Sequence, residues 1–385
     1  MTRTRRATAI IGIGQTDWSG DWRRVRAGEK PADSVGYAAQ AFQDALRDSG
    51  IPKDDIDGLI VGPTTAYERM GEVLGLNVRW GGQADAVQSI LQAQMAIEAG
   101  YAKVIALVYG NDQRSAGTQY GGPSAMGGQS FLSYVYHSPW GMTSQGALYA
   151  LTLRRYQHER GLSEADMGQV AVAQRAWASM NEAAIQRKQI TIDDYLQSRY
   201  VCEPLHVFDY CLVNDGGVAL IIADAEYAER MRPDPVYILG TGRSDLNTGA
   251  TSLEPRLTDY YLPAQQQAGA ASYEMAGIGP DDMDVMLAYD SFSVHVPLAL
   301  EGYGYCEVGD VAKFLAEKGI GPGGALPVNT HGGHLSESYM QGWNHQLEAV
   351  RQLRGTAGDR QVQGAQTVHY TSDVAGKCMS VIYGR

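Results

Sequence analysis

A tyrosine at the end of an expected buried strand is the first residue whose position suggests chemistry. The apolar run Val285-Met286-Leu287-Ala288 predicts a strand that delivers Tyr289 at its carboxyl end. Ligands of open α/β sheets bind beyond the carboxyl ends of strands, so this end is a candidate reaction site. A phenol with its usual pKa of about 10 is a proton donor, and it acts as a base only with help from neighbouring donors or a coupled proton path.

The other residue types that often carry chemistry do not form a site by spacing. The chain has four cysteines, without zinc-like spacing or a disulfide framework, which we expect to be small buried hydrophobic residues: Cys202, Cys211, Cys306 and Cys378. Four histidines have no partner at ligand spacing: His137, His158, His206 and His369. Gly12-Ile13-Gly14 lacks the third glycine and the downstream acid of a dinucleotide site. We therefore predict no metal and no bound cofactor.

The elements around Tyr289 occur twice in the chain. Gly50–Asp57 has the same pattern as Gly277–Asp284, and upstream of these segments Ile10–Gly14 matches Ile238–Gly242. Each copy predicts a strand, a helix, a short turn with proline and aspartate, and a second strand. The repeat predicts a duplicated α/β fold whose function lies where the two halves meet.

The helices of the two copies have recognisable ends. Asp33 or Ser34 is expected to cap a helix that stops at Gly50, and a helix around Ala264–Ala276 is expected to stop at Gly277. We place the first half at residues 1–233, which includes a loop region at 110–200, and the second half at residues 234–385. Three helical segments are expected in or near the loop region: Leu151–Arg160, Ala173–Ala184 and Ile190–Arg199.

Composition limits the class of protein. The net charge of −12 argues against nucleic acid as a partner. No apolar run reaches the roughly 18 to 20 residues of a membrane span, and the start lacks a signal-peptide pattern, so we expect a cytoplasmic protein.

The 23 tyrosines against 5 phenylalanines suit a pocket or interface that is apolar but partly wet. Several lie in the Gly-rich segment 110–146, either a substrate cover or subunit contact or a variable surface: Tyr120, Tyr134 and Tyr136.

Four motifs together resemble the thiolase superfamily, in the branch of sterol-carrier-protein-type thiolases often called lipid-transfer proteins. They are Gly12-Ile13-Gly14-Gln15-Thr16, Glu203–Gly217, Gly277–Phe292 and Asn329-Thr330-His331-Gly332-Gly333. The resemblance extends over essentially the whole chain. It implies an α/β thiolase fold, with two duplicated halves and mixed sheets in a five-layered α/β/α/β/α arrangement. It also implies a homodimer and acyl-CoA substrates.

The sequence departs from a working thiolase at both cysteines. The family's nucleophile should stand at the start of a helix beginning around Gln83–Asp85, but no cysteine occurs between Met1 and Val201. The second cysteine should fall around Thr371–Gly376, which also has none, and Cys378 lies beyond that turn. Without a thiolate, covalent acyl transfer cannot run.

Both histidines of the family motifs are replaced by tyrosine. The His-Asp-x-Phe motif reads Tyr289-Asp290-Ser291-Phe292, and the Gly-His-Pro motif reads Ser338-Tyr339-Met340. This pairing resembles the thiolase-like aldolases of bacterial steroid side-chain degradation. The resemblance implies retro-aldol cleavage of a β-hydroxyacyl-CoA, such as a 17-hydroxy steroid side-chain CoA thioester, to a 17-ketosteroid and propionyl-CoA. It also implies a complex with a small OB-fold, zinc-containing partner of the DUF35 type.

In this hypothesis Tyr289 and Tyr339 act as the base and the acid, in an order that the sequence leaves open. His331, or the histidines at 334 and 345, would assist the base, and Asn329, His331 or a backbone amide would hold the enolate oxygen. Coenzyme A enters only as part of the substrate. Two alternatives stay open: a non-catalytic acyl-CoA or sterol carrier or scaffold subunit, and a thiolase.

Overall fold

The computed structural model describes residues 6–118, 140, 142, 144–245, 259–374 and 377–385. Tyr120, Tyr134 and Tyr136 of the Gly-rich segment, and Gly376 of the last glycine turn, lie outside these residues. Within the described ranges, no helix combines the length and the apolar character needed to cross a membrane.

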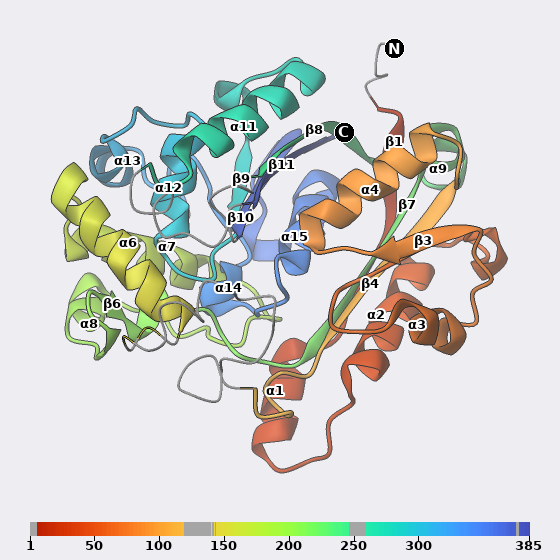
Figure 1. The fold of residues 1–385 in the computed structure, drawn as a ribbon, viewed down its shortest axis with the longest axis horizontal. Coiled ribbons are helices and arrows are strands. Elements are labelled where there is room, and N and C mark those ends of the chain that lie inside the picture. The colour runs from red at the N-terminus through yellow and green to blue at the C-terminus, as the bar shows by residue number, and fades with distance from the viewer. Residues whose placement is uncertain (1–5, 119–139, 141, 143, 246–258, 375–376) are drawn as a thin grey trace.

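Nine strands form one mixed sheet in the order β3-β2-β4-β7-β1-β8-β11-β10-β9 (Figure 1). The first half of the chain supplies β1 (Thr8–Gln15), β2 (Gly58–Val61), β3 (Trp80–Gln83), β4 (Val104–Asn111) and β7 (Gly216–Asp224). The second half supplies β8 (Val236–Asp245), β9 (Val285–Ala288), β10 (Thr367–Val374) and β11 (Lys377–Gly384). The two sets join where β1 pairs with β8, at Ala9 opposite Tyr237. The predicted duplicated α/β fold is confirmed.

Helices cover both faces of this sheet. The helices of the first half are α1 (Trp18–Arg26), α2 (Ser34–Ser49), α3 (Tyr67–Leu74), α4 (Ala86–Glu98), α6 (Gln145–Arg160), α7 (Glu164–Ser179), α8 (Ile192–Leu196) and α9 (Ala225–Met231). Those of the second half are α11 (Leu262–Ala276), α12 (His295–Gly302), α13 (Val311–Glu317), α14 (Gly333–Ser336) and α15 (Trp343–Arg354). Two short strands, β5 (Tyr200–Cys202) and β6 (Leu205–His206), form a small separate sheet.

The strands of the first half form one β layer and those of the second half form the other, and the two layers are joined through β1 and β8. With the helices, the layers follow the order α/β/α/β/α. Helix α2 packs on β1, β4 and β7, and α11 packs on β8 and β11, so these two helices form outer layers on opposite sides (Figure 1). Helices α4 and α15 form the middle layer, because each contacts strands of both halves. Their side chains share one core, in which Val87 and Val350 meet Leu220 and Val381. Strands β4 and β7 are buried along nearly their whole length, which explains their continuous apolar sequences.

Repeated glycines allow the outer helices to approach the sheet. A Cβ on Gly14 of β1 would lie 2.1 Å from the carbonyl oxygen of Ala41 in α2. A Cβ on Gly242 of β8 would lie 1.9 Å from the carbonyl oxygen of Ala268 in α11. Any side chain at either position would push helix and strand apart. The repeat in the sequence therefore reflects the same close contact made once in each half.

Helix ends agree with the prediction in the two copies and differ in the middle segment. Asp33 caps α2 by accepting a hydrogen bond from Gly36, and Gly50 and Gly277 end α2 and α11 with positive φ values of 68° and 66°. The helix expected at Ala173–Ala184 is wrong in its bounds, since α7 spans Glu164–Ser179. A capping box between Ser163 and Asp166 starts this helix earlier.

Candidate active site

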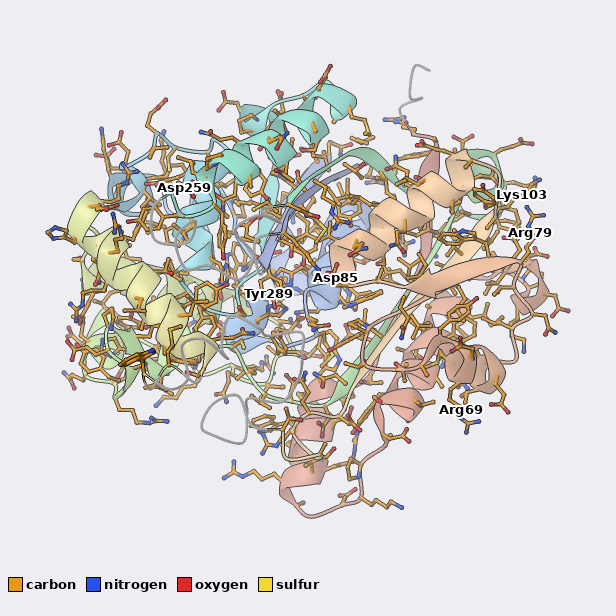
Figure 2. All side chains as sticks on the ribbon, in the orientation of Figure 1. Arg69, Arg79, Asp85, Lys103, Asp259 and Tyr289 are labelled. Atoms are coloured by element: carbon orange, nitrogen blue, oxygen red, sulfur yellow. The ribbon has the colours of Figure 1, made fainter. Side chains whose placement is uncertain are left out.

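The two predicted tyrosines meet in the interior of the protein. Tyr289 directly follows β9, and its N–H donates to the carbonyl of Thr371 in β10 over 2.9 Å. Its phenol oxygen lies 3.1 Å from that of Tyr339. In the view of Figure 2, Tyr289 and Asp85 lie near the middle of the molecule, away from Arg69, Arg79 and Lys103 at one side. The predicted position of Tyr289 at a strand end is confirmed, and the structure brings the two phenols into hydrogen-bond contact.

Burial makes Tyr289 a proton donor in its resting state. Its side chain is only 5% exposed, and this desolvation raises the pKa of the phenol well above the usual value. The hydrogen bond with Tyr339 acts in the opposite direction but is the smaller effect. An isolated phenolate is therefore disfavoured at this position, and a proton is more easily passed between the two phenols than lost to solvent.

Two asparagines of the first half hold the backbone of Tyr339. Asn214, just before β7, accepts a hydrogen bond from the N–H of Tyr339 over 2.7 Å. Asn111, the last residue of β4, donates to the carbonyl of Tyr339 over 3.2 Å. The tyrosine pair is thus assembled where the halves meet, as the repeat predicts. Sequence reasoning missed both asparagines as site residues; for Asn111 the available signal was a polar amide at the end of a fully apolar strand.

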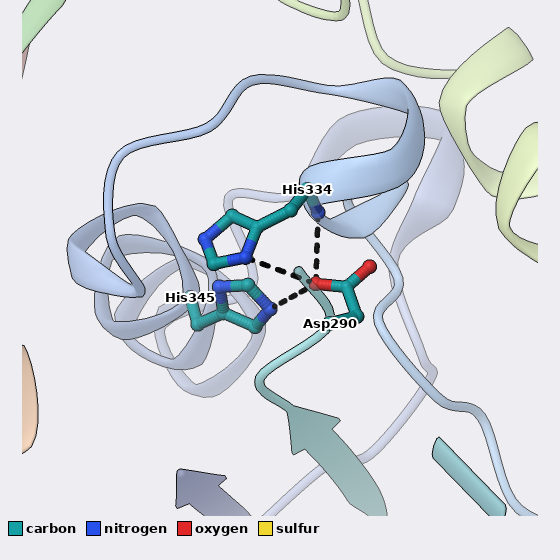
Figure 3. Close-up of side chains that lie close together, drawn as sticks. All are labelled: Asp290, His334 and His345. Carbon is teal, nitrogen blue, oxygen red and sulfur yellow. Dashed lines mark hydrogen bonds and ion pairs between the residues drawn. The ribbon is translucent and has the colours of Figure 1, made fainter. Parts of the chain in front are cut away.

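Asp290, the residue after Tyr289, joins two buried histidines (Figure 3). Its Oδ1 atom accepts a hydrogen bond from the backbone N–H of His334 over 2.9 Å and lies 3.4 Å from Nδ1 of the same residue. Nε2 of His345 is 3.1 Å from the same oxygen and 3.0 Å from the carbonyl of Ala288. All three side chains are fully buried. These residues are also the one described group whose ligand atoms lie close enough for a shared metal ion.

His334 is the histidine that contacts both tyrosines. The centre of its ring lies 4.8 Å from that of Tyr289 and 4.9 Å from that of Tyr339, both in edge-to-face geometry. Desolvation lowers the pKa of His334 well below its usual value, so the imidazole is neutral. Its Nε2 atom lies 2.9 Å from the N–H of Gly342 and 3.1 Å from Oδ1 of Asn344, so the ring has a partner in either tautomer.

His331 lies on the other side of His345. The centres of these two rings are 4.5 Å apart, and Nε2 of His331 is 3.8 Å from a carboxylate oxygen of Glu337. Desolvation lowers the pKa of His331 well below its usual value. The assistance of the base predicted for His331 stays a prediction, and its contacts connect it to the tyrosines through His345 and His334.

Asn329 supports the end of β9. Its Oδ1 atom accepts from the N–H of Ala288 over 2.8 Å, and its Nδ2 atom donates to the carbonyl of the same residue over 2.9 Å. The backbone of Asn329 has a φ of 50°, a conformation that asparagine tolerates better than most residues. The structure therefore shows a contact that positions Tyr289, whereas the predicted role as a donor to an enolate stays a prediction.

No thiol stands at the start of the middle-layer helix α4. Its N-cap is Asp85, whose side chain accepts from the N–H of Gln88, and Ala86 and Val87 follow. Cys378 lies within β11 as expected, and burial raises the pKa of its thiol well above the usual value. Burial also raises the pKa of the Cys211 thiol. These thiols are therefore poor nucleophiles.

Comparison with known proteins agrees with this geometry. A family model described as "Thiolase C-terminal domain-like" matches residues 246–385. A steroid side-chain-cleaving aldolase of Thermomonospora curvata is 33% identical over 91% of both chains. The chain belongs to the thiolase superfamily, among its thiolase-like aldolases. It is an enzyme of the carbon–carbon lyase class.

Two further relatives of this aldolase are similar over nearly their whole length. The 17-hydroxy-3-oxo-4-pregnene-20-carboxyl-CoA lyase of Mycobacterium tuberculosis is 32% identical over 98% of both chains. A solved structure named "Ltp2-ChsH2(DUF35) aldolase" has a TM-score of 0.89 and 29% identity, and the match covers 99% of this chain and 98% of that one. The thiolase fold predicted from the sequence is therefore confirmed.

Proposed function

We propose that this aldolase cleaves a 17-hydroxy steroid side-chain CoA thioester into a 17-ketosteroid and propionyl-CoA, without a covalent intermediate. The names of the two curated relatives, a steroid side-chain-cleaving aldolase and a pregnene-carboxyl-CoA lyase, support this substrate class. The observation that carries the mechanism is the hydrogen bond between the phenols of Tyr289 and Tyr339.

The reaction requires one proton to leave an oxygen and one to arrive at a carbon. A base takes the proton of the tertiary hydroxyl, the bond between the carbinol carbon and the carbon next to the thioester breaks, and its electron pair forms the thioester enolate. An acid then protonates the enolate carbon, which gives propionyl-CoA. No oxidant, free coenzyme A or water is consumed.

The tyrosine pair meets this requirement without a free phenolate. One phenol can accept the hydroxyl proton while it passes its own proton across the 3.1 Å hydrogen bond, and the second phenol gives its own proton to the enolate carbon as it receives that of the first. Both tyrosines end neutral, which is the state that the buried surroundings of Tyr289 favour. General acid and base catalysis of this kind typically contributes about 10² to 10⁴ in rate for each group.

The residues around the pair fix its position. Asn329 holds Ala288, one residue before Tyr289, and Asn214 and Asn111 hold Tyr339. We assign these three asparagines to positioning. The donor for the enolate oxygen is a backbone amide or a side chain such as His331.

We also propose a homodimer and a hetero-complex with an OB-fold partner of the DUF35 type. The partner is supported by the solved aldolase structure with a TM-score of 0.89, whose name includes a DUF35 component. The dimer rests on the resemblance to thiolases alone.

The direct test is mass spectrometry of the products from the 17-hydroxy steroid CoA thioester, incubated with the aldolase and its co-purifying partner without added coenzyme A. Propionyl-CoA and the 17-ketosteroid should appear, and Tyr289→Phe and Tyr339→Phe should abolish them. Tyr383→Phe is the matched control, since Tyr383 is fully buried in β11 and its hydroxyl has no hydrogen-bond partner among the described residues.

The two alternatives give different products. A carrier would retain intact substrate in a tight complex, and a Tyr339→Phe change would leave that binding unaltered. A thiolase would form product only after addition of coenzyme A and would be blocked by thiol alkylation. Either result would refute the proposed aldol cleavage.

A further inference from the structure

We propose that Asp290, His334 and His345 form a binding site for one divalent transition-metal ion of the Zn²⁺ type, next to the tyrosine pair. One carboxylate oxygen and one nitrogen from each ring lie within 4.8 Å of one another. Figure 3 shows both rings turned toward the same oxygen of Asp290. Two imidazoles and one carboxylate form a donor set that Zn²⁺ accepts in proteins, with a fourth position left for another ligand.

The spacing of the donor atoms matches an ion at their centre. Oδ1 of Asp290 is 3.4 Å from Nδ1 of His334 and 3.1 Å from Nε2 of His345. Ligand atoms at the usual bond lengths around a tetrahedral Zn²⁺ ion lie about 3.4 Å from one another. The two ring nitrogens lie within 4.8 Å of each other, so side-chain shifts that bring all three pairs of ligand atoms to about 3.4 Å would replace the hydrogen bonds by metal bonds.

Each imidazole can present a lone pair to the ion without losing its proton from the ring. For His334 the proton moves to Nε2, where Oδ1 of Asn344 stands 3.1 Å away as an acceptor, and the N–H of Gly342 gives up its 2.9 Å hydrogen bond to that nitrogen. Such an outer acceptor is the usual companion of a metal-bound histidine. For His345 the proton moves to Nδ1, an atom that has no hydrogen-bond partner in the described part of the chain. The carbonyl of Ala288, which His345 would release, keeps its hydrogen bond from Asn329.

The buried charge of Asp290 is the second reason to expect a metal ion at this site. Asp290 is fully buried, and no lysine or arginine in the described ranges forms an ion pair with it. Among the residues that the structure describes, its charged form is held by two backbone N–H groups, of His334 and Leu335, and by the two histidines. Burying a carboxylate without a compensating cation is costly, and a divalent ion would supply the missing charge.

The ion would lie one imidazole away from the reaction site. The ring of His334 contacts the rings of both Tyr289 and Tyr339. A bond from the metal ion to His334 would therefore hold in place the imidazole against which both tyrosine rings pack. The proposal does not depend on the aldol mechanism, and its test therefore measures metal binding rather than activity.

The test is a titration of the EDTA-treated aldolase with Co²⁺, followed by the visible absorption of the bound ion. We expect one Co²⁺ per chain, with the intense bands of a tetrahedral site, and displacement by Zn²⁺. Asp290→Asn and His345→Gln should each weaken binding by at least about 100-fold, and Asn344→Ala, which removes only the outer acceptor, by about 10- to 100-fold.

Control variants separate this site from surface binding and from misfolding. His158→Ala removes an exposed histidine and should leave the titration unchanged. Zn²⁺ should raise the Tm of the wild-type protein but not that of Asp290→Asn, whose metal-free Tm shows whether it folds. Absence of tetrahedral Co²⁺ bands in the wild type, or equal binding by folded Asp290→Asn, would overturn the proposal.

Discussion

The phenol oxygens of Tyr289 and Tyr339 lie 3.1 Å apart, although the two residues are anchored to different halves of the protein. Tyr289 is carried by β9 of the second half, whereas the backbone of Tyr339 is held by Asn111 and Asn214 of the first half. Any change in how the halves pack would therefore alter the distance between the phenols. The distance between the two phenols thus depends on the packing of both halves, and we expect the two tyrosines to act as one functional unit.

A double-mutant cycle tests whether the phenols act together. Tyr289→Phe and Tyr339→Phe should each lower kcat by about 10² to 10⁴, because each removes one member of the proton path. The kcat of the double variant should be only slightly below that of the slower single variant, because the loss of either phenol already interrupts the proton path. Tyr383→Phe should retain the wild-type kcat. Additive losses in the double variant would show that the two tyrosines work independently.

Asn214 should affect turnover more than substrate binding. Asn214→Ala leaves the buried N–H of Tyr339 without an acceptor, which costs about 1–3 kcal/mol of stability and loosens the tyrosine. Steady-state kinetics should show a fall in kcat with little change in KM, and Asn214→Asp, which keeps an acceptor oxygen, should recover part of the loss. Asn181→Ala is the matched control, as it removes another buried amide, which bonds to Glu337 and to the carbonyl of His331. An equal loss of kcat in both alanine variants would contradict a specific role for Asn214.

Much of the fold could be predicted because its causes are local. The capping side chain of Asp33, the positive φ of Gly50 and the close contact of Gly14 with α2 all act over a few residues or repeat in both halves. The strand that carries Tyr289 was recognisable from four apolar residues. The bounds of α7 differ from the prediction because its capping box, at Ser163, precedes the apolar pattern at Ala173–Ala184.

The surroundings of the tyrosines could not be predicted in the same way. Asn111 and Asn214 lie at the ends of neighbouring strands, but only the three-dimensional path of the chain brings them to Tyr339. Asp290 and His334 come together through a contact between the end of β9 and the start of α14, and no spacing rule connects them. Tertiary packing determines these contacts, so a sequence pattern can point to the two tyrosines without revealing what holds them.

Gly342 should be intolerant of any side chain. It is the N-cap residue of α15 with a φ of 86°, and a Cβ there would lie 2.0 Å from the hydroxyl oxygen of Tyr370 and 3.2 Å from a ring atom of Tyr289. Gly342→Ala should lower the free energy of unfolding by about 2–4 kcal/mol and reduce kcat, because it displaces Tyr289. Gly355→Ala, at the other end of the same helix, has a φ of 72° but no atom within 4 Å. It should cost only about 1 kcal/mol and leave kcat unchanged, as measured by denaturant unfolding and kinetics.

Glu337, two residues before Tyr339, should make stability depend on pH near neutrality. Both of its carboxylate oxygens accept hydrogen bonds from asparagine amides, at 2.8 Å from Asn181 and 2.9 Å from Asn344, but the side chain is only 1% exposed. Desolvation raises its pKa from 4.5 to about 7, with a smaller contribution from the nearby carboxylate of Glu348. The bond from Asn344 and the charges of Arg351 and Arg360 oppose this shift but do not cancel it.

The sign of the effect follows from the two pKa values. Between about pH 4.5 and 7 the folded protein keeps the proton on Glu337 while the unfolded chain has lost it, so stability falls as the pH rises through this window. The loss amounts to about 3 kcal/mol from this group. Glu337→Gln cannot titrate, so it should gain about that much relative to the wild type between about pH 5 and pH 8 in urea unfolding. Glu98→Gln, at the exposed end of α4, should differ from the wild type by the same amount at both pH values. If Glu337→Gln behaved like Glu98→Gln, Glu337 would have to be ionised throughout, and the amides of Asn181 and Asn344 would then be strong enough to offset its burial.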